Sequence, residues 1–383
     1  MSDVPTPVSP VSREPNRLAS IDGWRALAVL GVLWWHAWIH VGNPPLALSI
    51  AGVSINLQRL LVPLGNGVEF FFVLSGFCIQ LSLTRGFPEL NLCSYGRFVW
   101  HRWRRLTPAF YFVCAVTAAA LLFAGVAIAP SNYVAHAFWL YGVWPGAWAF
   151  SPPFWSLQVE WEFYLLVPLL LLIRRPALRW KILVALLLAS LVWRYYAHLT
   201  VDGIASGFEH LPMNFHGFAF GLILAHGWSG GARWVQRLYG PLPLIAGTTL
   251  AFVGRGLGST EVFALAGPFG PLAKTLCAPL MTLGFALMIA STLGGGIRGF
   301  NRLLSSRPLQ TIGRLSYGIY LWHWWPCVWI GNAFFNRHGP SAGIHYLTLA
   351  ATLAISLPLA WITWTWFERP YFRSGKTGPA PAA

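Results

Sequence analysis

The sequence is poor in charge, above all in acidic charge, and it has few cysteines. Only 11 of 383 residues are Asp or Glu, and 10% are charged, against about 25% in an ordinary soluble domain. The five cysteines lie far apart and mostly inside apolar segments, so they are predicted to be small buried side chains without a metal-type pair. The sequence also lacks a Walker loop and a glycine-rich nucleotide fingerprint.

Apolar and aromatic residues dominate instead. The chain is 56% hydrophobic and 16% aromatic, with 22 Trp, and runs of about 20 apolar residues, long enough to cross a bilayer, recur from end to end. The sequence therefore predicts an all-α polytopic membrane protein. Ten transmembrane helices are predicted, at residues 24–41, 66–84, 106–128, 154–173, 179–198, 210–228, 240–255, 266–292, 312–335 and 343–367.

The distribution of basic residues predicts the orientation of these spans. The net charge is +15, but the basic residues form short clusters between apolar runs, which favours positive-inside loops over a nucleic-acid surface. With ten spans and both termini cytoplasmic, 20 of the 26 Lys and Arg face the cytoplasm and three lie in outer loops. The aromatic segment 129–153 is an outer loop, an interfacial helix or a re-entrant piece, and an eleventh crossing there would reverse every later loop.

The ends of the chain differ in composition from its middle. Residues 1–20 are rich in Pro and Ser and are predicted to be a disordered cytoplasmic tail. The first apolar stretch has no small-residue cleavage site after it, which indicates a retained span instead of a signal peptide. We expect a membrane domain over 21–372, a disordered cytoplasmic tail over 373–383 and no attached soluble domain.

The first predicted span contains two ionisable residues. An ionisable group at mid-bilayer costs at least about 2.5–3.5 kcal/mol, so each is a candidate for function. Arg25 and His36 are eleven residues apart, close to three helical turns, which places them on one face and roughly 16 Å apart along the axis. Taken alone, Arg25 is equally consistent with a side chain snorkelling to the headgroups, and His36 with a hydrogen-bonded interior histidine.

Other predicted spans supply further acids, phenols and a second histidine. Glu69 lies one turn inside the second span, and Glu160 opens the fourth with Tyr164 one turn beyond it. Tyr317, Tyr320 and His323 follow one another at steps of three in the ninth span, which predicts one shared face. Together these residues predict an interior site.

The loop before the third span contains "RWRRLTPAF". If this stretch is helical, Arg102 and Arg105 project to one side, and guanidinium groups match phosphate oxygens bidentately. The alternative is ordinary positive-inside charge.

Six stretches in order resemble the acyltransferase-3 family of integral membrane acyltransferases. They are "LASIDGWRALAVLGVLWWHA", "GVEFFFVLSGF", "RWRRLTPAF", "FWSLQVEWEFYLLVPLL", "LSYGIYLWHWW" and "WFERPYF". The resemblance implies transfer of an acyl group, most simply acetyl, from cytoplasmic acyl-CoA to a hydroxyl of a glycan or similar acceptor, in the bacterial inner membrane. The family's arginine–histidine pair falls on Arg25 and His36, its double-arginine motif on Arg102 and Arg105, and its acidic position on Glu69.

The resemblance and the residue chemistry together give each residue a predicted role. Arg25, Arg102 and Arg105 would bind the donor, acyl-CoA or more specifically acetyl-CoA. His36 would remove the acceptor proton, with Glu69 or Glu160 orienting its ring, by direct transfer or through an acyl-histidine. Substrate contact or structural support is expected from Ser75, Tyr164, Tyr317, Tyr320 and His323, and no metal is expected. The alternative function is a proton-coupled transporter of a small molecule or acylated glycan, because intramembrane His, Glu and Arg also form proton relays.

Overall fold

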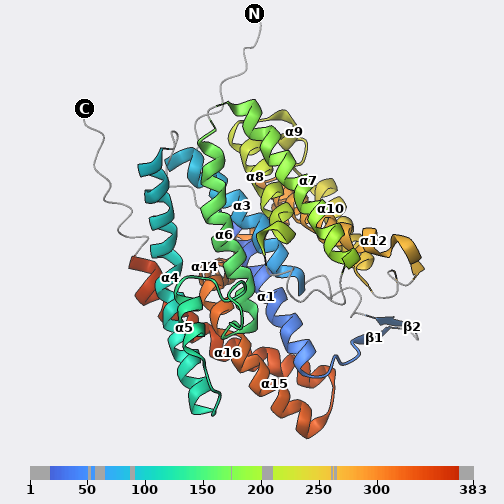
Figure 1. Cartoon of the computed structure of the whole chain (residues 1–383). Coiled ribbons are helices and arrows are strands. Elements are labelled where there is room, and N and C mark those ends of the chain that lie inside the picture. Colours follow the sequence, from blue (N-terminus) through green and yellow to red (C-terminus); the bar gives the residue numbers. More distant parts are fainter. Residues whose placement is uncertain are drawn as a thin grey trace, which may run out of the picture.

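The computed structural model describes residues 18–50, 53–56, 65–86, 91–173, 175–200, 210–259, 262 and 265–370, and within these it is almost entirely helical (Figure 1). The helices are α1 (Ala19–His40), α3 (Gly67–Gly86), α4 (Leu92–Phe123), α5 (Pro130–Ala137), α6 (Trp155–Leu171), α7 (Pro176–Thr200), α8 (Leu211–Ser229), α9 (Arg233–Gln236), α10 (Pro241–Leu257), α12 (Gly270–Leu293), α13 (Arg298–Leu304), α14 (Arg307–Trp322), α15 (Trp324–His338) and α16 (Ala342–Thr363). Short 3₁₀ turns cover Pro152–Phe154 and Gly267–Phe269, and a π-helical turn covers Trp364–Glu368. The predicted C-terminal tail and residues 1–17 lie outside the described residues, and α1 already begins at Ala19.

Each of the ten predicted spans contains at least one of these helices. Within the described ranges, five helical stretches are long and apolar enough to cross a membrane by length and composition: Gly67–Gly86, Leu92–Phe123, Ala177–Leu199, Gly267–Leu293 and Ala342–Glu368. The chain is therefore a multi-pass membrane protein.

Segment 129–153 contains a single short helix. Its one helix, α5, has eight residues and is about 12 Å long, whereas a hydrocarbon core is about 30 Å thick. After α5 the chain folds back to the start of α6, where the Tyr141 hydroxyl donates to the Phe154 carbonyl at 2.7 Å. The segment therefore contains no helix long enough for an eleventh crossing.

One local expectation was wrong, and one short element was not predicted. The stretch before the third span, expected to be a loop, is the first part of α4, because Asn91 and Ser94 form a capping box that starts the helix at Leu92. The all-α prediction is confirmed for the described residues, which add one short two-stranded antiparallel hairpin, β1 (Ala47–Ile50) with β2 (Val53–Asn56). Its strands contain the β-branched residues that favour extended backbone.

Close approaches between helices form the frame around the site. On α3, a Cβ at Gly76 would lie 2.2 Å from the Phe218 carbonyl oxygen of α8, and a Cβ at Gly221 of α8 would lie 2.1 Å from the Val73 carbonyl oxygen of α3. Only glycine fits at both positions, so the two backbones touch directly, as at small-residue interfaces between membrane helices. The opposite face of α3 is left to line a cavity.

The ninth predicted span, 312–335, is interrupted at His323, between α14 and α15. Pro326 explains the break, because its ring clashes with the carbonyl four residues earlier and it has no N–H to donate. The interruption leaves the Tyr320 carbonyl to accept a hydrogen bond from the His323 ring at 2.7 Å.

Candidate active site

One pocket collects eight of the eleven predicted site residues. It holds about 770 Å³ of empty space, part of it open to the outside, between α1, α3, α4, α6 and α14. The predicted residues that line it are Arg25, Ser75, Arg102, Arg105, Glu160, Tyr164, Tyr317 and Tyr320. His36, Glu69 and His323 lie outside this lining.

Three guanidinium groups converge on the pocket from two helices. Arg25 of α1 donates from Nε to the Ser316 hydroxyl at 3.2 Å, and buried Arg102 of α4 donates to the Ser82 hydroxyl at 2.6 Å. Arg105 lies one turn after Arg102, and the charges of all three act on the Cys78 thiol. The prediction that Arg102 and Arg105 project to one side is confirmed, because both line this pocket. The pocket therefore has a strongly cationic wall.

A carboxylate with two hydroxyl partners also lines the pocket. One oxygen of Glu160 accepts hydrogen bonds from both the Ser75 hydroxyl of α3 and the Tyr164 hydroxyl one turn along α6. The Arg102 guanidinium lies over the Tyr164 ring, 5.9 Å from its centroid. This cluster places an anion, two hydroxyls and a cation within one wall of the cavity.

The predicted base, His36, is paired with His323. His36 Nδ1 lies 2.9 Å from His323 Nε2, and the rings stack with centroids 5.1 Å apart. The Tyr320 carbonyl can only accept, so Nδ1 of His323 carries its proton and Nε2, in a neutral ring, accepts from His36 Nδ1–H. This assignment follows from the hydrogen-bond network. It leaves the lone pair of His36 on Nε2, pointing away from His323.

Two spacing predictions can now be compared with the packing. Arg25 contacts Ser316 on α14, and His36 contacts His323 at the end of α14, so the prediction that Arg25 and His36 share one face of α1 is confirmed. Tyr317 and Tyr320 both line the pocket, whereas His323 lies outside its lining. All three side chains are buried. Tyr317 donates to the Leu106 carbonyl of α4, Tyr320 bonds to Ser156 at the start of α6, and His323 bonds to His36 of α1. The α14 end thus ties three helices together around the site.

Neither acidic residue orients His36, contrary to prediction. The hydrogen-bond partner of the His36 ring is His323, and Glu160 is bound by Ser75 and Tyr164. Glu69 accepts from the Asn66 side chain at 3.1 Å, and the charges of Arg194 and Arg255 act on it. The reason is helical geometry. Glu69 lies two turns before Gly76, on the face of α3 that meets α8, whereas the pocket is lined by the other face.

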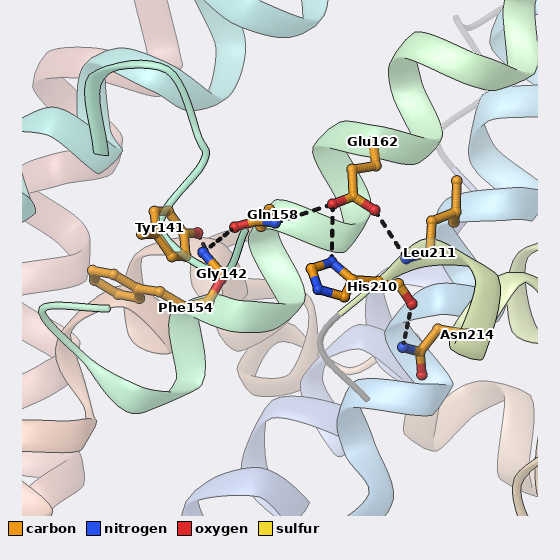
Figure 2. Close-up of polar contacts among 8 residues, drawn as sticks. All are labelled: Tyr141, Gly142, Phe154, Gln158, Glu162, His210, Leu211 and Asn214. Atoms are coloured by element: carbon orange, nitrogen blue, oxygen red, sulfur yellow. Dashed lines mark hydrogen bonds and ion pairs between the residues drawn. The ribbon is translucent and has the colours of Figure 1, made fainter. Parts of the chain in front are cut away.

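A second polar network joins segment 129–153 to α6 and α8 (Figure 2). Gln158 accepts from the Gly142 backbone N–H at 2.7 Å and donates to Glu162 at 3.0 Å. Glu162 also accepts from the Leu211 N–H at 2.9 Å, and its carboxylate lies 3.6 Å from His210 Nδ1. Since Glu162 is two residues from Glu160, the two carboxylates serve different faces of α6, as their spacing predicts.

Segment 129–153 is also held by His136. Its Nδ1 donates to the Asn132 carbonyl at 2.8 Å, and its Nε2 accepts from the Phe150 N–H at 3.1 Å. Burial lowers the pKa of His136 from 6.5 to about 4, so the ring is neutral at physiological pH. The neutral ring therefore connects the backbone at Asn132 to the backbone at Phe150, just before α6.

Some residues that line the pocket or bind its arginines were not predicted. Cys78 and Ser82 lie three and seven residues after Ser75, so helical spacing alone places them on the same face of α3. Ser316 and Ser156 carry no comparable signal, because isolated serines are common in membrane helices. Their roles follow from their contacts with Arg25 and Tyr320.

Known proteins are similar over most of the chain. The peptidoglycan O-acetyltransferase OatA of Listeria monocytogenes is 26% identical over 93% of this chain and 56% of its own length. The O-acetyltransferase OatA of Staphylococcus aureus is 25% identical over 94% of this chain and 58% of its own length. BcsY of Komagataeibacter xylinus is 26% identical over 88% of this chain and 81% of its own length. No solved structure matches the chain.

The chain therefore spans little more than half the length of the two OatA proteins. The family model for the acyltransferase domain matches residues 18–365, which include every residue of the pocket and both histidines of the pair. The chain belongs to the acyltransferase-3 family of integral membrane acyltransferases.

Proposed function

We propose that this protein is a membrane O-acyltransferase that moves an acyl group, most simply acetyl, from cytoplasmic acyl-CoA to a hydroxyl of a glycan or similar acceptor. The observation that carries the proposal is the pocket in which Arg25, Arg102 and Arg105 face Glu160 and its hydroxyl partners. Family membership favours transfer chemistry over the transporter alternative. The relatives named as O-acetyltransferases support acetyl as the group transferred.

The cationic wall suits the charged end of acyl-CoA. Guanidinium groups bind phosphate oxygens through paired, charge-assisted hydrogen bonds. The phosphates of CoA would lie against Arg102 and Arg105, and its slim pantetheine arm would pass Arg25 into the pocket. His36 lies about 16 Å further along α1, a distance that such an extended arm can cover.

The histidine pair suits removal of the acceptor proton. With its lone pair on Nε2, His36 takes the hydroxyl proton as the oxygen attacks the thioester carbonyl. The bond from acyl carbon to sulfur then breaks, and CoA leaves as the thiol once a proton reaches its sulfur. His323 fixes the tautomer and stabilises the charge that forms on His36.

Charge and helix order together support a ten-span topology. Each predicted span coincides with helix, and 20 of 26 Lys and Arg face the cytoplasm if both termini lie there. The pocket arginines then lie toward the cytoplasmic side, where acyl-CoA is found, and the network of Glu162 and His136 lies toward the outer side. We place the protein in the bacterial inner membrane on this basis.

Mass spectrometry of surface glycans tests the proposal. Cells that carry the gene should show a glycan mass step of one acyl group, and cells without it should not. Re-expression of a His36→Ala variant should fail to restore the step, whereas an exposed-surface variant such as Lys181→Gln should restore it. Unchanged glycan masses, together with an absence of acyl-CoA binding by the purified protein, would overturn the proposal.

A further inference from the structure

A second cavity lies on the far side of α3 and α6 from the candidate active site. It holds about 590 Å³ of empty space between the ends of α3, α6, α7 and α8 that the charge pattern assigns to the cytoplasmic side. Its lining consists of Gln80, Leu83, Val167, Leu170, Arg179, Trp180, Leu183, Leu222 and His226. It shares no lining residue with the donor pocket.

The lining divides into a polar end and an apolar wall. Leu83, Val167 and Leu183 are buried, and together with Leu222 they form a continuous aliphatic surface. Arg179 and His226 lie near the ends of α7 and α8 that the charge pattern assigns to the cytoplasmic side, whereas Gln80 lies one turn deeper than Leu83 on α3. The lining contains no acidic residue. A cavity with this division matches a ligand that has an anionic head and an aliphatic tail.

The polar end is held in place by specific contacts. Arg179 donates from Nη2 to the Ile173 carbonyl at 3.0 Å, just past the end of α6. Its charge acts on the His226 ring, which packs edge-on against Trp180 with centroids 4.7 Å apart. The guanidinium group is therefore held at the junction between α6 and α7 before any ligand arrives.

A further hollow continues the cavity past Trp180 and His226. It holds about 790 Å³ of empty space and is lined by Ile223, Gly227, Gly230, Ala232 and Trp234 in addition to these two residues. Trp234 is half exposed and lies directly on the α8 backbone, because a Cβ at Gly227 would fall 2.2 Å from its ring. Tryptophans with one exposed edge are typical of the headgroup level of a bilayer.

We propose that this cavity binds an anionic phospholipid of the cytoplasmic leaflet. The headgroup phosphate would accept hydrogen bonds from Arg179, with His226 beside it, and one acyl chain would lie along the wall formed by Leu83, Val167 and Leu183. Basic pockets between membrane helices on the cytoplasmic side recognise anionic headgroups through the same combination of charge and apolar wall. Charge complementarity selects the anionic lipid over a zwitterionic one.

A lipid in this second cavity would also affect the pocket of the candidate active site. Gln80 and Leu83 continue the helix that carries Ser75 and Cys78, and Val167 and Leu170 continue the helix that carries Glu160. A lipid chain between α3 and α6 would support the spacing of these two helices close to the Ser75–Glu160 hydrogen bond. The lipid site itself does not depend on the identity of the acyl donor.

Native mass spectrometry of the purified full chain in detergent tests the inference. Phosphatidylglycerol and phosphatidylcholine with the same acyl chains are titrated separately onto wild type, Arg179→Gln, Arg179→Lys and Lys181→Gln. Lys181 is the matched control, because it is an exposed cation on the same helix, two residues away and outside the cavity lining. The wild type should bind phosphatidylglycerol in preference to phosphatidylcholine.

Arg179→Gln should reduce the preference for phosphatidylglycerol about fivefold or more, the factor expected for one cation near an anionic headgroup. Arg179→Lys should keep most of the preference, and Lys181→Gln should keep all of it. Three results would each overturn the proposal. They are equal binding of the two lipids by the wild type, an equal loss in Lys181→Gln, and a loss in Arg179→Lys as large as in Arg179→Gln.

Discussion

Replacing the residues of the histidine pair one at a time separates proton removal from ring orientation. His36→Ala removes the base itself. His323→Leu removes the acceptor for His36 Nδ1–H and also the donor to the Tyr320 carbonyl. His323→Gln keeps both functions in principle, because its side-chain oxygen accepts from His36 and its amide donates to Tyr320.

The structure predicts the order of the acyl-transfer rates of these three variants. Loss of a general base lowers the rate by about 10²–10⁴-fold, so His36→Ala should be the slowest variant. In His323→Leu the ring of His36 loses a hydrogen bond in a buried site, a loss of about 1–3 kcal/mol. If the transition state bears that cost, the rate falls by about 5- to 150-fold. His323→Gln should fall between this variant and the wild type.

The assay is acetyl transfer measured as acetylated glycan formed per mole of detergent-purified enzyme. Acetyl-CoA binding is measured separately on the same samples, and elution as a monodisperse peak confirms folding. All three variants should bind acetyl-CoA close to wild-type affinity, because neither histidine lines the donor pocket. A His36→Ala variant that transfers acetyl at close to the wild-type rate would refute the assignment. A His323→Gln variant no faster than His323→Leu would refute the tautomer argument.

Four further results are expected. Arg102→Ala should weaken acyl-CoA binding by about 1.5–3 kcal/mol, with partial rescue by lysine, which lacks the guanidinium fork; unchanged binding would remove Arg102 from the donor site. In a variant whose only cysteine is Cys78, bound acyl-CoA should slow maleimide labelling, since the thiol lines the pocket, and equal labelling rates would contradict donor binding there. Reporters inserted after Gly231 and after Gly339 should report opposite sides of the membrane, and the same sidedness would contradict the ten-span topology. The folded-state pKa of His136 is lowered from 6.5 to about 4, so the unfolded chain binds more protons at this residue and the stability of the fold should fall as pH drops from about 6.5 toward 4. The melting temperature of a His136→Gln variant should fall less steeply over this pH range. An equal slope in the variant and the wild type would count against the burial of a neutral ring.

Long apolar runs made the helical architecture predictable. A segment of about 20 apolar residues can satisfy its backbone in lipid only as a helix, so each of the ten predicted spans contains helix. Helical spacing also predicted that Arg25 and His36 share a face and that Arg102 and Arg105 project together. These are local properties, set by residues within a few turns of one another.

The errors arose where the outcome depended on another part of the chain. Spacing on α3 could not reveal that the Glu69 face meets α8, because that contact depends on two glycines, Gly76 and Gly221, on different helices. The break at Pro326 was readable in principle, but the resulting bond from His323 to the Tyr320 carbonyl required the folded geometry.

The sequence by itself determined a multi-pass helical protein of the acyltransferase-3 family and named most of the residues of its pocket, since composition, periodicity and motif order are properties of the chain. Only the tertiary structure decided which of those residues meet. It paired His36 with His323 instead of with an acid, and it gave Glu160 two hydroxyl groups as hydrogen-bond donors. It also placed Glu69 where the charges of Arg194 and Arg255 act on it. The physical reason is that a hydrogen bond across 287 residues of sequence is set by how helices approach one another, and that approach depends on small residues and helix breaks distributed along the whole chain.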